Sequence, residues 1–93
     1  MTSKKSKTWI IEYAHSAYEE ITALDGAVKK LIKKAIEDKL MVDPLKFGSP
    51  LRRNLAGLFK LRVGNYRIIY QIKNNEVIVL IVAIGHRSRV YKD

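Results

Sequence analysis

The residues of this chain best suited to chemistry are cations in its second half. Residues 47–93 hold nine lysines and arginines against two acidic residues, whereas residues 1–46 hold nine basic and seven acidic residues. Arginine can bind a phosphate with two parallel hydrogen bonds, histidine can transfer protons, and tyrosine can stack on a nucleobase. The pattern therefore indicates binding of a polyanion, with chemistry at a phosphodiester as its most specific form. The candidate residues are Lys60, Arg62, Arg67, His86, Arg87, Arg89 and Tyr91.

Each candidate also has an ordinary structural explanation when it is taken alone. Arg67 stands between Tyr66 and Ile68 in an apolar stretch, where it could face solvent or pair with an acidic residue. Tyr91 could pack on the end of a sheet, and a lone histidine such as His86 is more often structural than catalytic. The net charge of +9 could simply keep the protein soluble, or it could bind a polyanionic partner. The concentration of charge in one half favours nucleic acid, ahead of an anionic membrane or an acidic protein.

Several other chemistries lack the residues they require. The chain has no cysteine, and His15 and His86 are its two histidines, with no nearby ligand at zinc spacing. Carboxylates are scarce in the basic half, no serine sits in a Gly-x-Ser-x-Gly setting, and the glycines form no phosphate-binding loop. We therefore expect no metal and no cofactor, and any phosphodiester chemistry should be metal-free.

Length and composition predict one globular domain. The chain has 93 residues, of which 47% are hydrophobic and 29% charged. Residues 1–7 should form a flexible basic leader, and residues 8–93 the domain. The apolar run that follows the leader is interrupted by Glu12, which argues against a signal peptide, and no stretch is long enough to span a membrane. A soluble cytoplasmic protein is the expected result.

The first half of the domain should contain a strand and a helical hairpin. Residues 8–13 are rich in strand-forming side chains. Ser16 and Glu19 have the spacing of a capping box, which predicts a helix from Ser16 to about Leu24, and Asp25 could cap a second helix. Pro44 should end that helix, and residues 43–57 should be mainly loop. The apolar positions of the second helix, at helical spacing, are Val28, Leu31, Ile32, Ala35, Ile36 and Leu40.

The second half should contain three strands joined by tight turns. The predicted strands span residues 58–63, 66–72 and 77–84, with turns at 64–65 and 74–75. The last strand is apolar throughout, so we expect it to be central. The fold class is therefore α+β, in the order β-α-α-β-β-β, with an antiparallel-rich small sheet. The helical hairpin should cover one face of the sheet, and the other face should remain open and basic.

Five short motifs give the sequence a family likeness when their order and spacing are taken together. They are Pro-Leu-Arg at 50–52, Asn-Leu-Ala-Gly-Leu at 54–58, Lys-Leu-Arg-Val-Gly-Asn-Tyr-Arg-Ile-Ile-Tyr at 60–70, Gly-His-Arg at 85–87 and Val-Tyr at 90–91. With these motifs the chain resembles the RelE/ParE superfamily of bacterial toxins, and most of all its RelE branch. The likeness extends over roughly residues 8–91.

The resemblance implies a type II toxin that acts as a ribosome-dependent endoribonuclease, cleaving mRNA in the ribosomal A site. In that family the 2′-hydroxyl of the RNA attacks the adjacent phosphate without a metal, and a 5′-hydroxyl is released. By motif position, Lys60 resembles the catalytic lysine, Arg67 and Arg87 the phosphate-binding arginines, and Tyr91 the terminal tyrosine that orients the RNA. Arg62, His86 and Arg89 would be additional RNA contacts. The implied partners are an acidic RelB-like antitoxin, which would form a hetero-oligomer with the toxin, and the ribosome with its mRNA.

One departure from the family pattern leaves the proton-transfer roles open. RelE has a second lysine two residues before its counterpart of Lys60, and this chain has Leu58 there. His86 is an alternative acid or base. The resemblance also leaves open a ParE-like toxin that inhibits DNA gyrase and cuts no RNA, since one fold serves both. The set Lys60, Arg67, Arg87 and Tyr91 favours RNA cleavage, and a nontoxic nucleic-acid-binding domain is a third interpretation.

Overall fold

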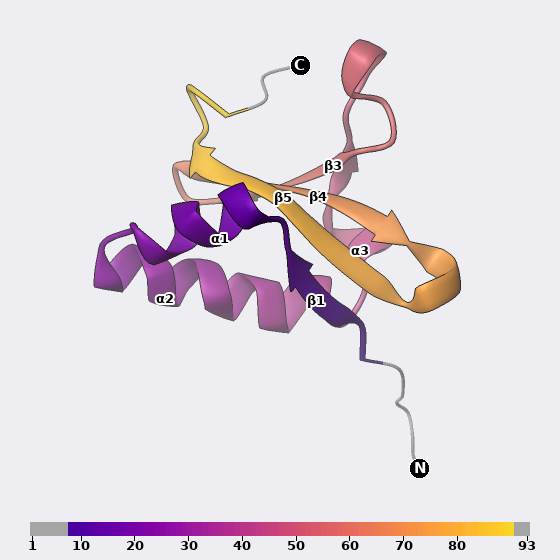
Figure 1. Ribbon diagram of the computed structural model, residues 1–93, viewed down its shortest axis with the longest axis horizontal. Helices are drawn as coiled ribbons and strands as arrows, with labels where there is room; N and C mark the ends of the chain where they lie inside the picture. The colour runs from indigo at the N-terminus through magenta and orange to yellow at the C-terminus, as the bar shows by residue number, and fades with distance from the viewer. Residues whose placement is uncertain (1–7, 91–93) are drawn as a thin grey trace.

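The computed structural model describes residues 8–90 (Figure 1). The predicted leader at 1–7 and the candidate Tyr91 lie outside the described residues. Two helices lie together on one side of a twisted sheet, as the sequence predicted (Figure 1). Within residues 8–90, no helix combines the length and apolar character that crossing a bilayer requires. The main elements are β1 (Ile10–Tyr13), α1 (His15–Thr22), α2 (Gly26–Ala35), α3 (Pro44–Phe47), β2 (Ser49–Pro50), β3 (Phe59–Val63), β4 (Tyr66–Lys73) and β5 (Ile78–His86).

The described strands form one five-stranded sheet in the order β1-β5-β4-β3-β2. The antiparallel arrangement predicted for the last three strands is confirmed, with β4 paired to both β3 and β5. β5 is flanked on both sides, which agrees with its apolar sequence. β1 pairs with β5 in parallel. Parallel strands need a long connection, and here it contains the helices and the strands between β1 and β5. The α+β class is the one expected from the sequence. The predicted β-α-α-β-β-β order is found with two additional short elements, α3 and β2, before β3.

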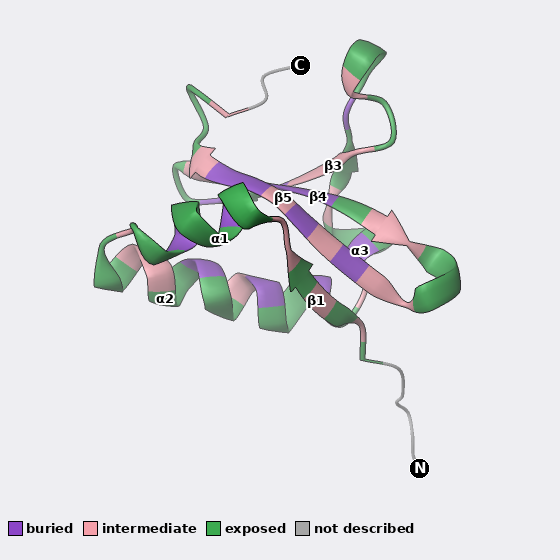
Figure 2. Ribbon diagram, in the orientation of Figure 1, coloured by how far each residue is buried: buried purple, intermediate pink, exposed green. Residues whose placement is uncertain are grey.

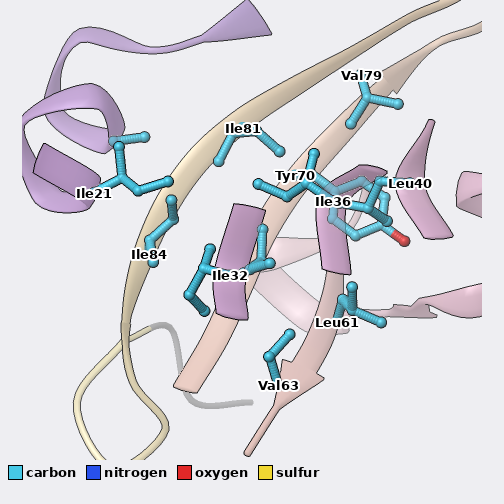
Figure 3. Close-up of a cluster of buried hydrophobic side chains, with 12 residues drawn as sticks. Ile21, Ile32, Ile36, Leu40, Leu61, Val63, Tyr70, Val79, Ile81 and Ile84 are labelled. Atoms are coloured by element: carbon cyan, nitrogen blue, oxygen red, sulfur yellow. The ribbon is translucent and has the colours of Figure 1, made fainter. Parts of the chain in front are cut away.

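The main core lies between the helices and one face of the sheet. The buried side of the second helix supplies Ile32, Ile36 and Leu40, and these pack against Leu61, Tyr70 and other residues of the central strands (Figure 3). Burial follows one stripe of each helix while the opposite stripe is exposed (Figure 2). Of the positions predicted to be apolar contacts, Leu31 is 52% exposed and lies outside this core.

The helix boundaries differ from the prediction because strand pairing sets where the first helix begins. The N–H of Ala14 donates to Ile81 O (2.8 Å), and Ala14 O accepts the first helical bond from Tyr18 N (2.9 Å). α1 therefore begins at His15, and no side chain caps it, so the predicted capping box is wrong. The Glu19 side chain, predicted to take part in the cap, has its Oε2 atom 3.3 Å from Nε2 of His15.

The second helix also ends differently from the prediction. α2 is continued by a π-helical turn, Ile36–Leu40, and Asp25 at its N-cap makes no capping hydrogen bond through its side chain. Pro44 opens the short helix α3 rather than only ending the one before it, and Asp43 caps α3 by accepting from Lys46 N (3.2 Å). The region predicted as loop thus contains α3, β2 and a 3₁₀ turn at Arg53–Leu55.

Tyr70 anchors this connecting region to the core. Its side chain is fully buried, its hydroxyl donates to Pro44 O (2.7 Å), and its ring stacks on Phe59 with the centroids 5.7 Å apart. A Cβ atom on Gly48 would overlap the Tyr70 hydroxyl, so the chain can pass this close only with glycine there. Burial, with a smaller contribution from Asp43, raises the pKa of Tyr70 above its ordinary value of 10.0.

Candidate nucleic-acid interface

The β3–β4 hairpin brings three candidate cations onto one face of the sheet. Arg62 and Arg67 are directly opposite each other in the register, and Lys60 lies two residues before Arg62. Because side chains alternate between faces along a strand, all three belong to the same face. The turn that fixes this register contains Gly64, whose φ of 61° is readily adopted by glycine. We call Lys60, Arg62 and Arg67 the hairpin cations.

The hairpin cations lie beside a second, smaller apolar cluster on the face away from α1 and α2. Leu51, Ile69 and Ala83 are buried there, and Leu55, Leu58, Val82 and Val90 pack against them. Lys60 and Arg67 are half-buried and Arg62 is exposed, and the Nε atom of Arg67 is fully covered. The expectation of an open face is therefore corrected: the segment before β3 and Val90 cover part of it.

Arg87 extends the same face beyond the end of β5. Its N–H donates to Asn65 O (2.8 Å), which continues the pairing of Arg67 with Gly85 and of Tyr66 with His86. Gly85 is the register partner of Arg67, and Arg87 is two residues further along the chain, so the register assigns Arg87 to the same face. Arg87 is then the diagonal neighbour of Arg67, and such neighbours are about 7–8 Å apart between Cα atoms. The phosphate-binding candidates of two separate motifs thus meet at one end of the hairpin.

Residues 87–90 fold back over this face, where Val90 packs beside Gly85 and the second apolar cluster. A Cβ atom on Gly85 would lie 3.4 Å from Cβ of Val90. A turn holds Val90 there, since the N–H groups of Arg89 and Val90 both donate to His86 O, at 2.9 and 3.2 Å. The chain after β5 and the segment before β3 rise on the same side of the sheet, away from α1 and α2 (Figure 1).

His86 and Arg89 belong to a different part of the surface from the hairpin cations. His86 pairs with Tyr66 on the helix side of the sheet, and the two rings meet edge to face at 5.8 Å. A groove of about 460 Å³ runs along the outer edge of β5 at this end. Its polar lining residues are Ser16, Glu20, Tyr66, His86 and Arg89. We call it the β5 groove. The structure therefore brings Lys60, Arg62, Arg67 and Arg87 together by register and separates His86 from them.

Glu20 is a residue of this region that sequence reasoning missed. β1 ends at Tyr13, opposite Ile81, so the described chain places no strand beside the last residues of β5 on that side. The Oε1 atom of Glu20 accepts from the N–H of Ile84 (2.8 Å) and so replaces the missing strand partner. Its four-residue spacing from Ser16 is a faint sequence signal, because it shows that both residues share one face of α1.

Among residues 8–90 the structure contains no group of three or more histidine, cysteine or acidic side chains arranged to hold a metal ion. What the interface does offer is positive charge beside apolar atoms. Two unit charges 4 Å apart interact by about 4 kcal/mol at an effective dielectric of 20, compared with about 1 kcal/mol in water. A phosphate at the hairpin cations would therefore be held more strongly than one at an exposed lysine.

Known proteins with similar sequences are bacterial toxins. A family model described as the ParE toxin of the type II toxin-antitoxin system parDE matches residues 11–91. Toxin RelG of Mycobacterium tuberculosis is 30% identical over 84 residues, which cover 90% of this chain and 97% of the relative. The mRNA interferase toxin RelE of Escherichia coli is 24% identical over 81 residues, covering 87% and 85% of the two chains.

Solved structures give the same result for the fold. The toxin-antitoxin complex RelBE2 of M. tuberculosis contains a chain with a TM-score of 0.82 and 29% identity, covering 92% of this chain and 99% of that one. The isolated E. coli RelE toxin has a TM-score of 0.72 at 22% identity, with 89% and 90% coverage. At that lower identity the likeness concerns the fold alone.

Proposed function

The chain belongs to the ParE toxin family of type II toxin-antitoxin systems, in the RelE/ParE superfamily, and from this premise we propose that it is a ribosome-dependent endoribonuclease that cleaves mRNA in the ribosomal A site. One observation carries the proposal: the register puts Arg67 opposite Arg62 and beside the extension that bears Arg87. Three guanidinium groups on one face form a surface suited to a multivalent anion, and an RNA backbone is such an anion. The relative named mRNA interferase toxin RelE supports RNA as the target.

The reaction that fits these side chains is transesterification within the RNA. The 2′-oxygen attacks the adjacent phosphorus as its proton leaves for a base, and the bond from phosphorus to the 5′-oxygen breaks as that oxygen gains a proton. The products are a 2′,3′-cyclic phosphate and a 5′-hydroxyl. The nucleophile belongs to the substrate, so the protein has to position the RNA, move protons and stabilise negative charge. No metal is required for these tasks.

We assign the roles by position in the family motifs and, for the described residues, by their place on the surface. Arg67 and Arg87 bind the non-bridging oxygens and stabilise the charge that grows on them in the transition state. Lys60, half-buried near the apolar cluster, accepts the 2′ proton or neutralises the phosphate. Arg62 and Arg89 contact the neighbouring RNA backbone, and Tyr91 stacks on a base. Removing one preorganised donor to such a site costs about 10²–10³ in rate.

The partners follow from the same proposal. A RelB-like antitoxin rich in acidic residues would neutralise a chain with a net charge of +9. Similar toxin chains are found in the RelBE2 complex of M. tuberculosis and in the intact RelBE complex of E. coli. The substrate is mRNA held by the ribosome, so the toxin would act in the cytoplasm.

Expression of the chain in a bacterium tests the proposal by primer extension on translated transcripts. We expect breaks in phase with codons, ending in 5′-hydroxyl groups. Arg67→Ala and Arg87→Ala should each reduce cleavage at least a hundredfold. Lys30→Ala, which removes an exposed cation on α2, is the matched control and should cleave like the parent. Unchanged cleavage in both arginine variants would reject the assigned site.

The second candidate is inhibition of DNA gyrase, which is favoured by the ParE description of the matching family model. In this case the basic surface would be a binding surface for the gyrase complex rather than a catalytic site. A supercoiling assay with purified gyrase separates the two functions. Inhibition of supercoiling together with intact mRNA would establish the ParE-like activity and exclude the nuclease.

A further inference from the structure

The ring of His86 has one nitrogen whose role is fixed by its neighbours. The backbone N–H of Ser88 donates to Nδ1 (3.2 Å), and Oγ of Ser88 lies 2.8 Å from the same atom. A backbone amide can only donate, so Nδ1 must be an acceptor and carries no proton in this arrangement. A neutral imidazole with a bare Nδ1 carries its proton on Nε2.

The same geometry limits what Nε2 can do. Nε2 is protonated in this neutral tautomer, and it is also protonated when the ring is a cation. In either charge state Nε2 is therefore a hydrogen-bond donor. The edge-to-face contact with Tyr66 restrains the ring from another direction, and the ring lines the β5 groove together with Arg89.

We propose that Ser88 is a positioning residue that sets His86 as an Nε2–H donor, and that His86 and Arg89 together bind a phosphate oxygen of the RNA in the β5 groove. This inference rests on the proposed RNA target and adds to it a second phosphate site at the outer edge of β5, in a groove lined from both faces of the sheet. Two donors of this kind suit an anionic oxygen. The RNA backbone would then cross the end of β5, from the hairpin cations to the groove.

The assignment also decides whether His86 could replace the lysine that RelE has at the position of Leu58. A ring that donates through Nε2 and accepts from Ser88 through Nδ1 has no site left to take the 2′ proton. His86 also lies on the helix side of the sheet, whereas Lys60 lies on the other face. The general base must therefore be sought on the face of Lys60, and His86 is a binding residue.

Nitrogen-15 NMR of the histidine rings in the uniformly labelled full-length protein tests the tautomer directly. His15, exposed on α1 and near Glu19, is the other imidazole and serves as the internal reference. We expect the spectrum of neutral His86 to show a bare Nδ1 and a protonated Nε2. Ser88→Ala removes the shorter Oγ contact and leaves only the 3.2 Å bond from the backbone N–H, so part of the His86 population should change tautomer. Ser88→Thr should restore the parent pattern, and His15 should not change. A protonated Nδ1 in the parent would overturn the assigned tautomer, and an unchanged His86 ring in Ser88→Ala would overturn the positioning role of the Ser88 hydroxyl.

Binding of a short single-stranded RNA tests the phosphate site separately. Ser88→Ala should weaken binding about two- to tenfold, as expected for one exposed hydrogen bond, and Ser88→Thr should recover it. Equal affinity in Ser88→Ala, despite an altered tautomer, would reject the phosphate site. If the parent shows the expected tautomer but neither binds RNA nor cleaves it, the ring geometry stands and the proposed function fails.

Discussion

Arg62 and Arg67 occupy directly opposite positions across the β3–β4 hairpin, where like charges repel. Arg62 is the exposed member of the pair, so its charge can be removed without opening the core. We expect Arg62→Thr to raise the free energy of unfolding by up to about 1 kcal/mol and to weaken RNA binding at the same time. Urea denaturation and RNA titration measure the two effects.

The matched control for this prediction is Lys73→Thr. Lys73 is also a cation of β4, but its register partner is Ile78. The same change there should leave RNA binding unaltered and give no comparable gain in stability. Loss of stability in Arg62→Thr would show that the two arginines do not oppose folding.

At the same scale, the sequence predicted some site residues well and others poorly. The hairpin cations were predictable because a two-residue turn and the period of two fix which side chains share a face. Their position beside Arg87 follows from the same register. The separation of His86 from them was not predicted, although it occupies an adjacent position in the sequence. Glu20 was missed because its partner, Ile84, is 64 residues away and nothing local marks the contact.

Among the elements, β4 contacts α3 through a titratable group, the Tyr70 hydroxyl, which donates a hydrogen bond to Pro44 O. Its folded-state pKa is raised, so the folded protein favours the neutral phenol. The stabilising contribution should be fully present below about pH 10, the pKa of an unperturbed tyrosine, and should be lost as the pH rises above it. The expected loss is up to about 1.4 kcal/mol per pH unit for one proton.

Thermal denaturation between pH 8 and pH 11 checks this prediction. Tyr70→Phe should remove that part of the pH dependence, and it should lower stability near neutral pH by about 1 kcal/mol because the bond to Pro44 O is lost. Tyr18→Phe is the control, since Tyr18 is 58% exposed. A pH profile that is the same in Tyr70→Phe and the parent would contradict the assignment.

The edge of β5 gives a second prediction at this scale. Glu20→Ala should deprive the Ile84 N–H of its acceptor and destabilise the protein by about 1.5–3 kcal/mol, the usual range for a hydrogen bond to a charged group. Glu20→Gln keeps an acceptor oxygen and should lose less. Hydrogen exchange at the Ile84 amide should speed up in the alanine variant alone. Glu19→Ala, next to it on α1, should leave that amide protected.

The elements themselves were predicted from the sequence more reliably than their ends. The strands and the helical hairpin follow from periodicity, which reports the buried face directly. The start of α1 did not follow from Ser16 and Glu19 because a bond from Ala14 to β5 sets it, and a local motif cannot show a tertiary contact. The pairing of β1 with β5 was not deducible for the same reason.

For the molecule as a whole, charge makes RNA binding dependent on salt. Binding through the two hairpin arginines and Arg87 should release counterions from about three phosphates, so the logarithm of affinity should fall with the logarithm of salt concentration with a slope of about −2. Arg67→Ala should reduce the magnitude of that slope by about 0.7, and Lys30→Ala should leave it unchanged. Filter binding across a range of salt concentrations gives the slopes. Equal slopes in Arg67→Ala and the parent would place the RNA elsewhere.

The most direct test of the central claim presents both targets to the purified protein. Ribosomes carrying a defined mRNA are mixed with the parent chain or with Arg67→Ala, and gyrase supercoiling is measured in parallel. We predict that the parent cuts the ribosome-bound mRNA, leaves 5′-hydroxyl ends and does not inhibit gyrase, and that Arg67→Ala cuts at least a hundredfold more slowly. Intact mRNA with inhibited gyrase, or equal cutting by both proteins, would contradict an RNA-cleaving site at the hairpin cations.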